Sequence, residues 1–284
     1  MVANNTKQVI YIASFRLAAL LSVLVLLSIL FFIFKMGAHV VDAKFLTSMW
    51  HHRDIAQGGI FQAIVGTILL AVGVSILSIP IGICTAIYLN EYAADNLFTR
   101  MIRISIRNLA GVPSIVYGIF GLAFFVLFLN LGTSLISASL TLGAMTLPWI
   151  ITTSEESLKA VPLSFREGSY ALGATKLQTI WKTVLPNSFG GMMTGSILGV
   201  SRAMGETAPI IMVGATFFMS GLPTSIFDKF MTLPYHIFIL ATQHSSPNAK
   251  EYALGTALIL VSLIFILNFG IFFIRYRMRS KKEW

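Results

Sequence analysis

The chain is divided into long apolar runs that contain no charged residue. No charge occurs between Asp54 and Glu91 or between Arg107 and Glu155, and the second of these stretches is too long for one helix. A helix that spans a membrane needs about 20 predominantly apolar residues. The pattern therefore predicts six transmembrane helices, near residues 17–34, 62–88, 110–129, 135–153, 192–214 and 253–274, with a turn at 130–134.

The first apolar run has a competing interpretation, which is a secretory signal peptide. Its apolar part, residues 17–34, is longer than the ~7–15 residues of a signal-peptide core, and no clear cleavage site of small residues follows it. We therefore expect an uncleaved first helix.

Composition indicates an all-α integral membrane protein. Hydrophobic residues make up 56% of the chain and charged residues 11%, and the mean hydropathy is +0.82. Soluble domains carry about 25% charged residues. The formal net charge of +9 is then better explained by basic loops beside the membrane than by a nucleic-acid partner. The single cysteine, Cys84, excludes a disulfide within the chain, and we expect it to be a small core residue.

The basic residues are distributed unequally between the two faces that six spans create. Fourteen fall on one face, five fall on the other, and Arg202 lies within a span; the five are Lys35, Lys44, Arg53, Lys229 and Lys250. Because cytoplasmic loops carry the excess of lysine and arginine, both termini are predicted to be cytoplasmic. The predicted organisation is a cytoplasmic N-terminus (1–16), a six-helix domain (17–274) and a basic cytoplasmic tail (275–284).

One cytoplasmic loop, residues 155–190, carries signals for two short helices. Ser164 with Glu167 and Thr175 with Gln178 have the spacing of capping boxes at helix starts. Gly173 suits the left-handed conformation that stops a helix between them. Pro186 is expected to end the second helix.

Both loop helices are expected to have an apolar side. The first side consists of Phe165, Ser169 and Leu172, and the second of Leu177, Ile180, Trp181 and Val184. Such short helices are marginal alone and need a surface to pack on. That surface is either the ends of the chain's own helices and the membrane interface, or a groove on a cytoplasmic partner.

The same loop resembles the conserved cytoplasmic loop of bacterial ABC importer permeases. That pattern is Glu-Ala-Ala, three residues, Gly, nine residues, then Ile-x-Leu-Pro, and Glu167, Gly173, Leu185 and Pro186 match it in register. The chain departs from the pattern at Gly168, Ser169 and Thr183, which leaves the spacing intact. The resemblance implies that the loop docks onto an ATPase subunit, with Leu177 and Trp181 among the contact residues.

Four further stretches resemble the PstA-type permease of the phosphate ABC importer. They are AIYLNEYA (86–93), NLAGVPSIVYGIFGL (108–122), RAMGETAP (202–209) and MTLPYHIF (231–238). The resemblance implies a type I importer permease in the cell inner membrane that carries phosphate. It also implies a PstC-type permease partner, a PstB-type ATPase dimer that binds the ATP, and a PstS-type phosphate-binding protein. No cofactor is expected in this chain.

Arg202 is the unusual residue of the fifth predicted span, because an arginine at that depth costs ~2.5–3.5 kcal/mol. Glu206 follows one helical turn later. Either the two residues neutralise each other as a structural pair, or Arg202 lines the path of an anion, whose oxygens its guanidinium fits. Pro209 is expected to kink this helix. Ser114 in GVPS is a second candidate donor to the anion, or simply a packing residue.

Two residues of MTLPYHIF also have two interpretations. Tyr235 and His236 lie on the predicted outer face, where they either contact a binding protein or act as interfacial aromatic residues.

Other functions lack support in the sequence. There is no GxxxxGK[ST] phosphate loop, the histidines, including His51 and His52, have no zinc-ligand spacing, and no Ser/His/Asp set is apparent. We therefore expect neither catalysis nor a metal site. The alternatives are a permease for sulfate or molybdate, or a self-contained secondary anion transporter, which would show a repeat between its two halves. We find no such repeat.

Overall fold

The computed structural model describes residues 2–51, 58–244 and 246–280, and helices make up most of them. Four long helices are α1 (Val2–Gly37), α3 (Phe61–Ile87), α6 (Leu135–Lys159) and α12 (Ala249–Ser280). The shorter α-helices are α2 (Ala43–Thr47), α4 (Leu97–Leu109), α5 (Ser114–Gly121), α7 (Leu163–Ala171), α8 (Lys176–Thr179), α9 (Leu185–Met204), α10 (Ala208–Val213) and α11 (Leu233–Thr242). Among the described residues, β-structure is limited to one isolated bridge between Ala215 and Phe230.

Three wider π-helical segments and one 3-10 turn connect these helices. The π-helices are η2 (Tyr88–Tyr92), η3 (Leu122–Phe128) and η4 (Ile180–Val184), and the 3-10 turn is η1 (Ala38–Val40). Each π-helix directly continues an α-helix, so α3, α5 and α8 are extended rather than ended.

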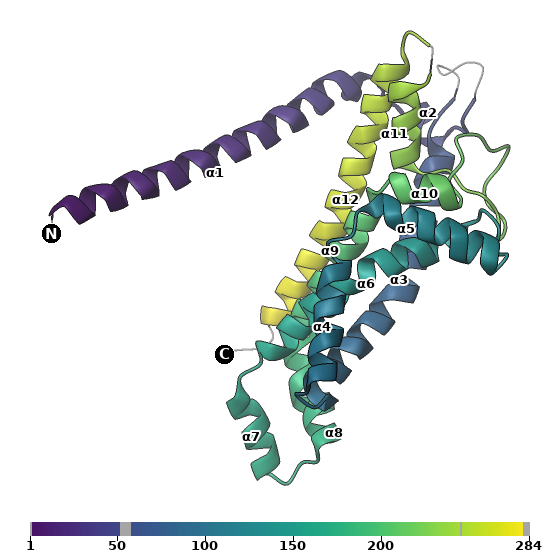
Figure 1. Cartoon of the computed structure of the whole chain (residues 1–284). Coiled ribbons are helices and arrows are strands. Elements are labelled where there is room, and N and C mark those ends of the chain that lie inside the picture. The colour runs from purple at the N-terminus through teal and green to yellow at the C-terminus, as the bar shows by residue number, and fades with distance from the viewer. Residues whose placement is uncertain (1, 52–57, 245, 281–284) are drawn as a thin grey trace.

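Four helices in the described part of the chain are long and apolar enough to cross a membrane, or five if one bent pair counts as a span. The expected count of six is therefore not reproduced by length and composition. The remaining predicted span corresponds to α9, whose small and polar residues lower its hydropathy. Helix α9 nevertheless packs against α3, α6 and α12 within the bundle (Figure 1).

The predicted third span is the second half of the bent pair. Helix α4 ends at Leu109, α5 starts at Ser114 after Pro113, and the two segments meet at 101°. Proline and glycine at this point account for the bend, because Pro113 has no N–H to continue a helical ladder. In Figure 1, α5 accordingly runs across the bundle and α4 runs along it.

The predicted fifth span, 192–214, is not one helix. Helix α9 ends at Met204, residues 205–207 are not helical, and α10 starts at Ala208. The ring of Pro209 would clash with the carbonyl four residues earlier, which belongs to Gly205, so the break precedes the proline by one turn. Arg202 therefore lies in the last turn of α9 and not in the middle of a span.

Small residues allow the central helices to approach one another closely. A Cβ on Gly121 or on Gly195 would collide with Thr141 or Thr153 of α6, and a Cβ on Gly73 would collide with Ser139. Such close packing of small residues is the usual basis of helix association in membranes. The buried core follows these contacts and includes Leu70, Val74, Ala138, Leu142 and Val200.

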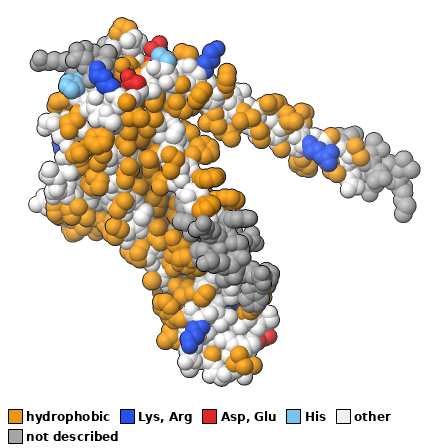
Figure 2. Space-filling view, turned by 180° about the vertical axis from the view of Figure 1, so that it is seen from behind, with side chains coloured by type: hydrophobic (Ala, Val, Ile, Leu, Met, Phe, Trp, Pro, Cys, Tyr) orange, Lys and Arg blue, Asp and Glu red, His pale blue; other side chains and the backbone are white. Residues whose placement is uncertain are grey.

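The surface has the distribution expected of a membrane protein. Hydrophobic side chains cover the middle of the bundle in Figure 2, while charged and histidine side chains gather toward its ends. Helix α1 extends away from the bundle (Figure 1), and its apolar part is not buried in this chain.

Cys84 is exposed on α3, so its predicted place in the core is wrong. Ala86 and Gly82 occupy the buried side of the same helix.

Several sequence-based assignments lie outside the described residues. They concern Arg53 and His52 in the first outer loop and Lys281 and Lys282 in the basic tail. The predicted domain limits at 16 and 274 stay predictions, since α1 and α12 run continuously through both positions.

Candidate anion pathway and coupling loop

Arg202 and Glu206 are paired across the end of α9. The Arg202 Nε lies 3.8 Å from a Glu206 carboxylate oxygen, at the limit of an ion pair. The Arg202 side chain is 60% exposed, whereas that of Glu206 is 18% exposed. Glu206 lies in the non-helical break and not on the helix, and its N–H donates to the Ala203 carbonyl. The arginine is therefore loosely held and accessible, and the glutamate is the more enclosed partner.

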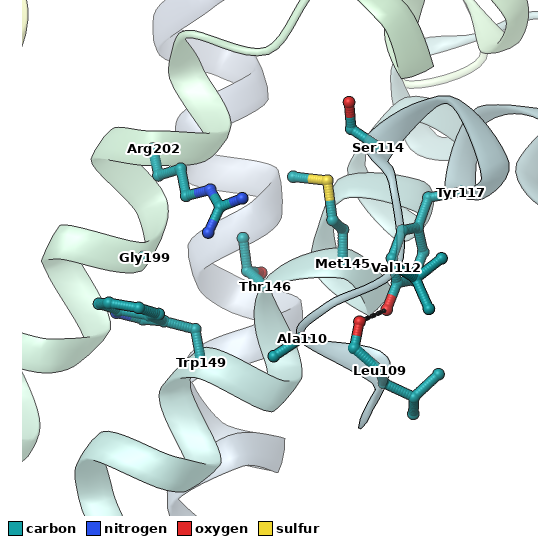
Figure 3. Close-up of a pocket in the computed structure, with 10 residues that line it drawn as sticks. All are labelled: Leu109, Ala110, Val112, Ser114, Tyr117, Met145, Thr146, Trp149, Gly199 and Arg202. Atoms are coloured by element: carbon teal, nitrogen blue, oxygen red, sulfur yellow. Dashed lines mark hydrogen bonds between the residues drawn. The ribbon is translucent and has the colours of Figure 1, made fainter. Parts of the chain in front are cut away.

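Arg202 and Ser114 line the same small pocket, whose cavity volume is about 30 Å³. Helix α6 contributes Met145, Thr146 and Trp149, and α9 contributes Gly199 next to the Trp149 ring. In Figure 3 the Arg202 guanidinium points from α9 toward α6, and Ser114 lies on the opposite side of the pocket. The structure thus brings together Arg202 and Ser114 from segments far apart in sequence.

The bend between α4 and α5 forms another wall of this pocket. The Tyr117 hydroxyl donates to the Leu109 carbonyl over 2.9 Å, as the dashed line in Figure 3 marks. This carbonyl ends α4 and also accepts from the Val112 N–H over 3.1 Å, while the residue four positions on, Pro113, has no N–H to donate. The hydrogen bond stabilises the bend that places Ser114 at the pocket.

The chemistry of the pocket suits an anion. A guanidinium offers up to five N–H donors in a planar fork, and hydroxyl groups add single donors. Apolar residues, including Leu109, Val112 and Met145, make up most of the remaining wall. The described residues of this wall contain no carboxylate, and Glu206 approaches Arg202 from outside it.

The predicted loop at residues 155–190, here named the coupling loop after its predicted role, has the expected two helices, α7 and the pair α8–η4. Gly173 joins them with a φ of +77°, which confirms the left-handed stop. The Thr175 and Gln178 capping box is also present. The predicted box at Ser164 is wrong, because α7 starts at Leu163, after Pro162, and has no side-chain cap, so Ser164 lies inside its first turn.

The ends of the loop differ from the prediction. Helix α6 continues to Lys159, so the loop proper begins later than residue 155. Pro186 does not end the second helix but lies in the first turn of α9, directly after the wider π-helical segment η4. Helices α8, η4 and α9 therefore form one continuous helical path from Lys176 to Met204.

The predicted apolar faces of the loop are divided between this chain and its surroundings. Ile180 and Val184 are buried in the chain's own core, while Leu177 and Trp181 are 57% and 65% exposed. Leu172 at the tip is exposed, and Leu185 packs partly against the core. Glu167 and Pro186 are also exposed. The chain's own core therefore covers Ile180 and Val184, while a groove on a partner stays a prediction for Leu177 and Trp181.

Sequence reasoning missed two ion-pair clusters at the base of this loop. Glu155 contacts Arg103 at 3.1 Å and Lys159 at 2.8 Å, and Glu91 contacts Arg166 at 3.0 Å. The available signal was that Glu91 and Glu155 each end a long charge-free run. Such residues are placed where apolar helices leave the bundle.

Helix α11, which carries Tyr235 and His236, lies at the opposite end of the bundle from α7 and α8 (Figure 1). His236 is buried among the rings of Trp50 and Phe217, with centroids 4.6 Å and 5.2 Å away. It neither faces solvent nor lies at an interface, so neither interpretation of its role holds in this conformation. Tyr235 is half-buried and packs against the core.

The chain matches a family model over residues 78–280, described as the binding-protein-dependent transport system inner membrane component. The chain belongs to this family. A probable ABC transporter permease protein, YqgH of Bacillus subtilis, is 36% identical over 80% of this chain and 76% of its own length. The phosphate transport system permease protein PstA of Mycobacterium leprae is 34% identical over 94% of this chain and 86% of its own length.

Solved structures support the same fold. One subunit of the MetNI methionine ABC transporter in an inward-facing conformation has a TM-score of 0.62 to this chain. The two chains share 16% identity, and the match covers 77% of this chain and 97% of the other. The chain is therefore a PstA-type permease with the type I importer fold and a multi-pass inner-membrane protein. Membership in this family implies an ATPase, a substrate-binding protein and a second permease subunit as partners.

Proposed function

We propose that this chain is the permease subunit of an ATP-driven phosphate importer and forms half of its translocation pathway. The observation that carries the proposal is the pocket that Arg202 and Ser114 both line, inside a PstA-type sequence. A guanidinium binds phosphate oxygens in pairs. Ser114 is a further hydroxyl donor toward the same ion. Glu206 orients Arg202 when no anion is bound and weakens its field, which lets the anion leave.

The proposal assigns the α7–α8 loop to the ATPase subunits. Leu177 and Trp181 are large apolar side chains that the chain itself leaves uncovered, and Glu167 is exposed beside them. The continuous helical path from α8 to Arg202 gives a direct mechanical route from this surface to the pocket. The loop and both termini are then cytoplasmic. This chain is non-catalytic and holds no cofactor, and a PstB-type dimer binds the ATP.

The remaining partners follow from the same assignment. A PstC-type permease supplies the other half of the pathway, and a PstS-type protein delivers phosphate to the outer face. The end of the bundle that carries Tyr235 is that outer face in this arrangement. Four positions of the loop motif belong to the ATPase contact or set its geometry: Glu167, Gly173, Leu185 and Pro186.

The test is uptake of labelled phosphate at micromolar supply in cells that lack this chain. Cells are restored with wild type, Arg202→Gln or Arg202→Lys, and assembly is checked by co-purification of the ATPase. We expect wild type to restore uptake, Arg202→Gln to abolish it with assembly intact, and Arg202→Lys to retain part of it. Full uptake by the assembled Arg202→Gln complex would show that Arg202 and Glu206 are only a structural pair.

Sulfate and molybdate uptake are measured in the same cells. Restoration of either anion without phosphate would replace the substrate assignment while keeping the importer. Uptake without any co-purifying ATPase would favour a secondary transporter.

A further inference from the structure

The coupling loop is joined to helix α3 by an ion pair that the sequence motif does not include. An Arg166 Nη2 lies 3.0 Å from a Glu91 carboxylate oxygen, with the two side chains 15% and 9% exposed. Glu91 lies in η2, the π-helical continuation of α3, and Arg166 lies in α7. The pair thus connects the cytoplasmic end of a central helix with the first helix of the loop.

Arg166 is held in this position by further hydrogen bonds. Its Nη1 donates to the Val161 carbonyl over 2.7 Å, and its Nη2 donates to the Leu158 carbonyl over 3.0 Å. The Asn90 amide also donates to the Glu91 oxygen, over 2.7 Å. One guanidinium therefore connects the end of α6, helix α7 and the end of α3. A lysine has no such fork and cannot reach three acceptors in one plane.

Little else fixes α7 to the rest of the chain. None of its residues is buried, and only Phe165 packs partly against the core. The Ser169 hydroxyl lies 2.9 Å from the Thr179 hydroxyl, but Thr179 belongs to the same loop. Arg166, through the ion pair with Glu91 and its hydrogen bond to the Leu158 carbonyl, is thus the main polar connection between α7 and the spans.

We propose that Glu91 and Arg166 are positioning residues that transmit movement of the coupling loop to α3. This proposal rests on the proposed function, in which the loop contacts the ATPase. The helical path through α8, η4 and α9 carries the movement to Arg202, and the ion pair carries it to α3. Helix α3 packs along α6, which forms one wall of the pocket, while α9 forms the wall that carries Arg202. The α6 wall and the α9 wall then move together. Without the ion pair, the ATPase moves α9 while α3 lags behind.

The experiment uses the complete transporter in proteoliposomes with Glu91→Gln, and Glu156→Gln as the matched control. Glu156 is an exposed carboxylate near the same end of α6, so its removal changes the charge equally without breaking this pair. We expect phosphate transported per ATP hydrolysed to fall about tenfold in Glu91→Gln, a size usual for coupling between sites. Hydrolysis without the binding protein should rise several-fold. Glu156→Gln should match wild type in both.

A purely structural role makes a different prediction. In that case, assembled Glu91→Gln complexes would keep the wild-type ratio of transport to hydrolysis, and this result would overturn the proposal. If Glu91→Gln does not assemble, Arg166→Gln is measured, and an unchanged ratio there has the same consequence. If wild type itself takes up no phosphate, the phosphate assignment fails, while hydrolysis without the binding protein still decides whether the ion pair couples the subunits.

Discussion

Glu206 approaches Arg202 to 3.8 Å from the break between α9 and α10, so a carboxylate faces the guanidinium that lines the pocket. An anion that binds Arg202 must compete with this carboxylate. The pair is weak, because the arginine is well exposed and such ion pairs contribute about 0.2–1 kcal/mol. The carboxylate therefore adjusts the affinity for the anion and does not block the site.

Glu206→Gln should consequently tighten binding and slow release. We expect the KM for phosphate to fall about two- to fivefold, the equivalent of the energy of an exposed pair, and the maximal rate to fall with it. Uptake kinetics over a range of phosphate concentrations measure both. An unchanged KM in an assembled complex would mean that Glu206 acts only on the fold of the break.

The two sides of α8–η4 should respond differently to truncation. Trp181 is exposed, so Trp181→Ala should leave the melting temperature of the isolated permease unchanged. The same variant should weaken binding of the ATPase about 30-fold or more, as expected for an interface hot spot. Ile180 is buried, so Ile180→Ala should cost about 2–5 kcal/mol of permease stability. Co-purification and thermal unfolding in detergent separate the two effects. Equal loss of stability in both variants would contradict the division of this helix.

Local signals explain which parts of this structure were predictable. Gly173 and Thr175 act on their own backbone within three residues, and both were found in the expected conformations. The end of α9 at Met204 could be predicted only by knowing that Pro209 disrupts a helix four residues upstream, at Gly205. The apolar pattern gave the right span near α5 but could not give the 101° bend.

Tertiary contacts explain what the sequence could not reveal. Leu177 and Ile180 share one helical face by spacing, yet the chain's own core covers only Ile180. Glu91 and Arg166 are 75 residues apart, and nothing local relates them. The placement of Arg202 and Ser114 around one pocket likewise depends on how α5 crosses the bundle. Helical periodicity identifies a face, but only the packing decides what covers it.

Gly118 on α5 allows that helix to lie against α10. A Cβ at this position would be 2.8 Å from the Pro209 Cα, which is a backbone atom and cannot rotate away. Gly118→Ala should therefore cost about 1–3 kcal/mol, the usual range for overpacking. Gly168→Ala in α7 is the matched control, since no atom lies within 4 Å of its added methyl group. It should be neutral or stabilise by up to about 1 kcal/mol, and thermal unfolding compares the two.

His236 should make the stability of the end of the bundle that carries α11 depend on pH. Burial, and to a smaller degree the charge of His244, lowers the pKa of His236 from 6.5 to about 3, in the short helix α11 that does not span the membrane. The folded state keeps this ring neutral, while the unfolded chain takes up a proton below pH 6.5. Stability is therefore complete above 6.5 and falls by about 1.4 kcal/mol for each pH unit between 6.5 and about 3.

The measurement is the melting temperature of wild type and His236→Gln in detergent from pH 8 to pH 4. Both proteins share every other titrating group, including His244, so the difference between their curves isolates His236. Wild type should lose its advantage as the pH falls below about 6.5, because glutamine has no proton to take up. Parallel curves across the whole range would mean that the ring is protonated, or solvated, within the folded protein.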